Sequence, residues 1–179
     1  MTPPLPALAA HARHPDRAAA LAFAGVMAKA LQAGRQPLIR GLAEARFQEM
    51  LQQHFDGLAL SNGGGAAAPA GWDEFDELVE LLLDHGALGD EQEAWLAYAI
   101  ATASMGENHL WQDLGLPSRK VLSDLMGEHF PALAAKNVGD MKWKKFFYRQ
   151  LCERAEVPIC KSPHCAECVD YRLCFGPEN

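Results

Sequence analysis

The sequence lacks any long apolar run: none approaches the roughly 20 residues that a membrane-spanning helix needs. It also lacks the basic first segment of a secretory signal, because it begins Met-Thr-Pro-Pro-Leu-Pro. We therefore expect a cytoplasmic protein with no membrane association. Basic residues are outnumbered, since 16 Lys and Arg face 23 Asp and Glu and give a net charge of −7. An acidic chain is a poor default ligand for phosphate backbones, so nucleic acid is not an expected partner.

Period-two alternation of apolar and polar residues is also missing, which argues against a β-sheet. Apolar residues instead recur at helical spacing, and hydrophobic residues make up 49% of the chain, enough for a core. We therefore predict an all-α fold, a helical bundle with a C-terminal cysteine-rich metal-cluster loop. The expected helices cover about 16–31, 37–54, 73–84, 90–104, a segment capped by Ser118, a short turn opened by Pro131, and 140–155.

Three regions are expected along the chain. Residues 1–15 are rich in Pro and Ala without a periodic pattern, which predicts a flexible N-terminal tail. Residues 16–156 should form the helical domain, interrupted by a low-complexity loop at 61–71 that is rich in Gly and Ala. Residues 157–179 should form a cysteine-rich, cluster-binding segment.

Cysteine is absent before position 152, yet Cys160, Cys165, Cys168 and Cys174 follow one another as C-x4-C-x2-C-x5-C. In a reducing cytosol, clustered thiols hold metal more often than they form disulfides. Thiolates suit zinc, copper(I) and iron–sulfur clusters. Structural zinc sites commonly use two short cysteine pairs and a longer spacer, whereas this motif has one short step and no spacer. We therefore favour one iron–sulfur-type site built by these four cysteines, with a zinc site as the alternative and disulfides as a third possibility.

A basic aromatic helix is expected just before this motif. Lys142, Lys145 and Arg149 share one face at 100° per residue, with Cys152 at its edge. The opposite face is apolar and should be core: Trp143, Phe146, Phe147 and Leu151. The basic face is either an ordinary solvated surface or a patch that attracts an anion or a partner, because a thiolate cluster is negatively charged.

Other single residues carry weaker signals. Cys152 is more typical of a half-buried helical cysteine than of a spare ligand or sulfur relay. His109 and His164, the latter adjoining Cys165, are secondary candidate metal ligands, although a lone histidine is usually structural. The sequence contains no G-x-S-x-G, H-E-x-x-H or P-loop motif, so it does not indicate a hydrolase. We do not expect an enzyme, and a cluster-bearing redox enzyme is the remaining alternative of that class.

At this point the sequence resembles a known family. The segment from Lys142 to Cys152, the four-cysteine motif ending Cys174-Phe-Gly, and the stretch HLWQDLGL that begins at His109 resemble the NifQ family of nitrogen-fixation proteins. The likeness is best from about residue 95 to the end.

The resemblance implies a molybdenum–iron–sulfur carrier that processes molybdenum and donates it for assembly of the nitrogenase iron–molybdenum cofactor. It implies an iron–sulfur cluster and molybdenum as cofactors, molybdate as a ligand, and the nitrogenase iron protein NifH and the scaffold complex NifEN as partners. Three cysteines would hold three irons of a cuboidal cluster and leave a corner for molybdenum. The alternative function is a zinc-stabilised module whose basic helix binds a protein or nucleic acid.

Overall fold

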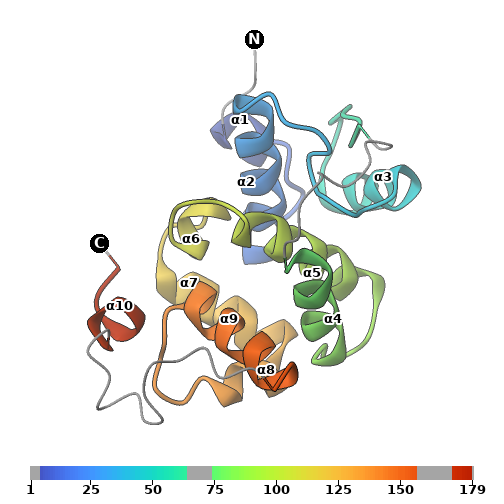
Figure 1. Ribbon diagram of the computed structural model, residues 1–179. Coiled ribbons are helices and arrows are strands. Elements are labelled where there is room, and N and C mark those ends of the chain that lie inside the picture. Colours follow the sequence, from blue (N-terminus) through green and yellow to red (C-terminus); the bar gives the residue numbers. More distant parts are fainter. Residues whose placement is uncertain (1–4, 64–73, 157–170, 179) are drawn as a thin grey trace.

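The computed structural model describes residues 5–63, 74–156 and 171–178 (Figure 1). The helices of these ranges are α1 (Leu5–Ala9), α2 (Ala18–Gln32), α3 (Glu44–His54), α4 (Phe75–Asp84), α5 (Glu91–Ser104), α6 (Leu110–Asp113), α7 (Arg119–His129), α8 (Pro131–Lys136), α9 (Trp143–Arg154) and α10 (Tyr171–Phe175). No strand forms within these ranges, although Ala12 and Phe55 make an isolated antiparallel bridge. The prediction of an all-α fold is therefore confirmed. None of the described helices is long and apolar enough to cross a membrane.

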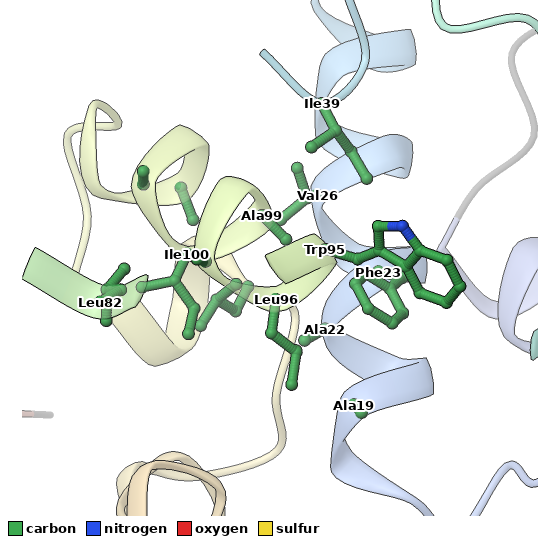
Figure 2. Packing of buried hydrophobic residues seen from close by; sticks show 14 of the residues in the cluster. Ala19, Ala22, Phe23, Val26, Ile39, Leu82, Trp95, Leu96, Ala99 and Ile100 are labelled. Carbon is green, nitrogen blue, oxygen red and sulfur yellow. The ribbon is translucent and has the colours of Figure 1, made fainter. Parts of the chain in front are cut away.

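Helix α5 lies at the centre of the bundle and packs against α2, α3, α4 and α6 (Figure 1). Most of its residues are buried, which explains why its apolar residues do not form a single stripe. Figure 2 shows Trp95 of α5 beside Phe23 of α2, while Leu96 and Ile100 of α5 also reach into the core, Ile100 on the side of Leu82. All five side chains are at most 1% exposed.

Small residues allow α2 and α5 to approach closely. Ala19, Ala22 and Val26 of α2 lie on the side of that helix that meets Ala99 and its neighbours on α5 (Figure 2). The distance between packed helices depends on the side chains at their contact, so alanines permit a short one. Gly25 of α2 likewise allows a close approach to the end of α6, because a Cβ at this position would collide with the backbone carbonyl of Leu114. A glycine is therefore required where α2 passes the end of α6.

Two helix starts follow from capping signals in the sequence. Asp90 Oδ1 accepts a hydrogen bond from the Glu93 backbone N–H at 2.9 Å, and α5 begins directly after Asp90. Ser118 Oγ accepts from the Val121 backbone N–H at 3.3 Å at the start of α7. Both helices therefore begin where their caps predict.

The second predicted helix begins later than expected, at Glu44 instead of Pro37. The cause is Asn62, whose side chain is fully buried. Its Oδ1 accepts from the Ile39 N–H at 2.8 Å, and its Nδ2 donates to the carbonyls of Ile39 and Leu42 at 2.9 and 2.6 Å. These backbone groups are thereby taken from a helical ladder. The low-complexity loop thus begins with a structural residue at Asn62, while residues 64–71 of that loop lie outside the described residues.

The N-terminal segment differs from the flexible tail expected for residues 1–15. Residues 5–15 include α1, and Leu8 is only 1% exposed within the core. The segment pairs with the end of α3: the Arg13 N–H donates to the His54 carbonyl at 2.9 Å, and the Asp56 N–H donates to the His11 carbonyl at 2.7 Å. This order comes from contacts distant in sequence, which a search for local periodicity does not detect.

Candidate metal centre

The four-cysteine motif is only partly within the described residues. Cys160, Cys165 and Cys168, together with His164, lie outside them, so their convergence on one site remains a prediction. Cys174 lies in α10 and is half-buried against the core. Among the described residues, no group of three or more His, Cys, Asp or Glu side chains could hold a metal ion.

Cys174 lies beside the beginning of α9. The backbone N–H of Lys142, the residue that precedes this helix, donates to the Cys174 carbonyl at 2.7 Å. The next residue, Phe175, packs so closely on Gly139 that a Cβ there would lie 2.9 Å from its ring. In sequence, the motif begins just after the end of α9, because Cys160 follows Ala155 by five positions. The structure places the last cysteine of the motif at the opposite end of the helix.

The apolar face of α9 is buried as predicted. Trp143, Phe146 and Phe147 are at most 4% exposed, and Leu151 is half-buried. The Trp143 and Phe146 rings meet edge to face with centroids 5.6 Å apart. The Trp143 Nε1–H donates to Ser123 Oγ on α7 at 3.2 Å. These contacts fix the rotation of α9 about its axis.

The predicted basic face is less uniform than expected. Lys145 is exposed, whereas Lys142 and Arg149 are half-buried, and the Arg149 guanidinium lies 3.3 Å from the Glu153 carboxylate. Cys152 is 8% exposed and belongs to the buried side of α9, not to the edge of the basic face. Cys152 is therefore more buried than the half-buried helical cysteine that the sequence predicts.

A hollow of about 480 Å³ lies between α9, the loop before it and Phe175. Its apolar lining includes Met141, Phe146 and Phe175. Its polar lining includes two cations and one carboxylate: Lys136, Arg149 and Glu153. Because Phe175 adjoins Cys174, the hollow borders the described part of the cysteine motif. The Arg149 guanidinium and the Glu153 carboxylate of this lining lie 3.3 Å apart, so the polar lining is mixed in charge.

Lys144 is a basic residue of α9 that lies outside the predicted basic face. Its Nζ donates to Asp113 Oδ2 at 2.6 Å and to the Gly106 carbonyl at 2.8 Å. Asp113 is 6% exposed and also accepts two hydrogen bonds from Asn108 at 3.1 Å, while Lys29 lies 3.4 Å away. Burial alone would raise the pKa of Asp113, but the hydrogen bonds from Lys144 and Asn108 and the nearby positive charges outweigh it and lower the pKa. This ion pair ties α9 to α6 and α2.

His109 contacts the C-terminal end of the described chain. Its Nδ1 lies 3.4 Å from Glu178 Oε1, and the Arg119 Nε lies 3.5 Å from Glu178 Oε2. Arg119 also donates to the carbonyls of Asp140 and Met141 at 2.8 and 3.0 Å. The Glu178 side chain is 4% exposed. The sequence did not predict a role for Glu178, because no motif or periodic pattern surrounds it.

These observations define an all-helical protein in which a cysteine of a clustered motif is tied to the start of a basic aromatic helix. A family model described as NifQ matches residues 22–176. The chain is 40% identical over 155 residues to Protein NifQ of Azotobacter vinelandii, covering 79% of this chain and 80% of that protein. It is 38% identical over 148 residues to Protein NifQ of Rhodobacter capsulatus, covering 82% of each.

The chain therefore belongs to the NifQ family. Over 82 residues it is 52% identical to Protein NifQ of Klebsiella pneumoniae, covering 45% of this chain and 48% of that protein. No solved structure matches the chain significantly. Membership of this family implies a role in nitrogen fixation and in the biosynthesis of the iron–molybdenum cofactor.

Proposed function

We propose that this protein is a molybdenum–iron–sulfur carrier that processes molybdenum and donates it for assembly of the nitrogenase iron–molybdenum cofactor. The observation that carries the proposal is the C-x4-C-x2-C-x5-C motif in a chain of the NifQ family. The carrier needs to bind and release its cargo without transforming a substrate, so we propose that it is not an enzyme.

The donor set fits an iron–sulfur group. Cys160, Cys165, Cys168 and Cys174 supply four soft thiolates, which is the ligand chemistry of such clusters. Cys174 lies half-buried at the edge of the core, where surrounding protein limits access of water. When bound, the cluster would supply sulfide ligands for molybdenum, which is the cargo.

The basic residues have a distinct task in this proposal. Lys142, Lys145 and Arg149 would attract molybdate or a partner and offset the negative charge of the thiolates. Arg149 is well placed for this because it lines the hollow beside Phe175. Lys136, which lines the same hollow, would add to the positive potential there.

We further propose the nitrogenase iron protein NifH and the scaffold complex NifEN as partners, in the cytoplasm. The competing function is a zinc-stabilised interaction module. Metal analysis separates the two, since protein purified without oxygen should contain iron and absorb broadly in the visible range if it carries a cluster. A colourless protein with one zinc per chain and no iron would refute the carrier proposal.

The basic face is tested by changing Lys142, Lys145 and Arg149 together to Ala. We expect iron content to be unchanged and molybdenum transfer to fall about tenfold at low salt, which is typical of electrostatic attraction. Rising salt should lower wild-type transfer towards the level of the variant, because screening removes the same attraction.

The matched control changes three exposed cations elsewhere to Ala, namely Arg13, Arg35 and Lys120. It removes the same net charge and should transfer molybdenum nearly as well as the wild type. Equal defects in the two triple variants would show that only net charge matters. Loss of iron in the α9 variant would show that the basic face supports the fold of the site.

A further inference from the structure

The last described residues, from Cys174 to Glu178, pack along the surface of the bundle and contact it at three points. The Cys174 carbonyl accepts from the Lys142 N–H at 2.7 Å. The Phe175 ring packs on Gly139. The Glu178 carboxylate lies between His109 and Arg119 at 3.4 and 3.5 Å. Within five residues, the chain therefore contacts the loop before α9, the start of α6 and the start of α7.

Of these three contacts, the one made by Glu178 involves a charged side chain. Its side chain is 4% exposed, and a carboxylate so buried is stable only beside positive charge or hydrogen-bond donors. Its Oε2 has no hydrogen-bond partner among the described residues, so the contact with Arg119 is Coulombic. The Arg119 Nε also lacks a hydrogen-bond partner among the described residues, so removal of Glu178 would leave this nitrogen facing no acceptor, while Nη2 of the same guanidinium keeps its ion pair with Asp140 at 3.1 Å.

Arg119 couples this carboxylate to Cys174. The same guanidinium that faces Glu178 donates to the carbonyls of Asp140 and Met141. Met141 directly precedes Lys142, whose N–H holds Cys174. The contacts therefore close a ring from Cys174 through the chain to Glu178, across to Arg119 and back to Lys142. A chain of four residues spans at most about 14 Å, so anchoring Glu178 restricts where Cys174 can lie.

We propose that Glu178 is a positioning residue that keeps Cys174 in place as a fixed ligand of the metal centre. In this arrangement His109 serves as an anchor for Glu178 and not as a metal ligand. The inference rests on the proposed function, because it assigns a role to one ligand of that site. Cargo is then loaded and released at a centre whose last cysteine does not move.

The test uses the full chain with Glu178→Ala and Glu178→Gln, the latter removing the charge and keeping the shape. The matched control is Glu128→Ala, whose carboxylate is 73% exposed and 3.9 Å from His129. Metal-free, reduced protein is treated with an alkylating reagent, and the rate at each cysteine is read by peptide mass spectrometry. Buried Cys152 is the internal reference, because its alkylation reports opening of the whole bundle.

We expect Cys174 to react about tenfold faster in Glu178→Ala, since loss of the Coulombic contact with Arg119 shifts a local opening equilibrium by about that factor. Glu178→Gln should fall between this variant and the wild type. Cys152 should be unaffected in all of them, and Glu128→Ala should match the wild type. Unchanged alkylation of Cys174 in Glu178→Ala would overturn the proposal, and so would an equal rise at Cys152, which indicates general destabilisation.

A second measurement uses protein reconstituted with iron and sulfide. Glu178→Ala should lose iron to a chelator about tenfold faster than the wild type, if the same local opening exposes Cys174. Iron loss at the wild-type rate would refute the role of Cys174 as a ligand held by Glu178. If the wild type itself takes up no iron, the carrier proposal fails, and the alkylation rates still decide whether Glu178 holds Cys174.

Discussion

The ion pair between Lys144 and Asp113 can be tested with a closely matched control, because the next residue, Lys145, is an exposed lysine on the same helix. Lys144→Met removes the donor at 2.6 Å and leaves a carboxylate that is 6% exposed. Breaking a buried pair costs about 3–5 kcal/mol when the remaining charge has no other partner. Asp113 keeps its hydrogen bonds from Asn108 and its contact with Lys29. We therefore expect a smaller loss, about 2 kcal/mol in the free energy of unfolding.

Urea denaturation followed by circular dichroism measures this loss. With a slope of about 2 kcal/mol/M, the midpoint should fall by about 1 M. The control is Lys145→Met, one residue further along α9, whose exposed side chain should matter by less than about 0.5 kcal/mol. Equal effects of the two substitutions would refute the assignment of Lys144 as the partner of the buried Asp113 carboxylate.

The pH dependence of the same variant gives a second check. The folded-state pKa of Asp113 is lowered from its ordinary value of 3.8. In the wild type, the stability that the ionised Asp113 carboxylate contributes is therefore complete above about pH 4 and is lost as the pH falls through the folded-state pKa. In Lys144→Met, burial favours the neutral carboxyl, so the difference from the wild type should shrink as the pH falls towards 4. A difference that stays constant over this range would show that lost packing, not charge, causes the effect.

The remaining predictions concern the core. Burial and neighbouring positive charges lower the pKa of His54 from 6.5, so its contribution to stability is complete above pH 6.5 and is lost as the pH falls through the folded-state pKa. The urea midpoint should drop between pH 7.5 and 5.5 in the wild type and less in His54→Leu; parallel pH profiles would contradict this. Gly25→Ala should lower the free energy of unfolding by about 2 kcal/mol or more, because its Cβ collides with the Leu114 carbonyl. Gly127→Ala is the control, since this helical glycine has open space around it and alanine should stabilise α7 by up to about 1 kcal/mol.

Local signals predicted much of the fold. Asp90 and Ser118 mark the starts of α5 and α7 because a cap acts within three residues of its own position. The buried face of α9 follows from helical spacing alone. The start of α3 did not follow, because Asn62 acts on backbone groups 20 and 23 residues away.

The candidate site was predictable to a smaller extent. The cysteine spacing predicts its ligands, but nothing local predicts that Cys174 lies beside the beginning of α9. The assignment of basic residues also depended on distant partners. Lys144 points inward because it binds Asp113, which lies 31 residues earlier in the sequence. A helical wheel of α9 shows only the residues of that helix and cannot reveal this partner. Glu178 went unnoticed for the same reason, since its contacts are with His109 and Arg119.

Helix α6 has a consequence for how sequences of this kind can vary in length. With its two capping residues, α6 contacts three parts of the chain: the N-cap His109 contacts Glu178, Asp113 binds Lys144, and the carbonyl of the C-cap Leu114 lies against Gly25. One inserted or deleted residue would turn everything beyond it by about 100° and misalign these contacts together. A substitution in this segment affects one of these contacts, whereas a change in its length affects all three. The spacing from His109 to Leu114 is therefore a constraint in its own right, separate from the identity of the residues between them.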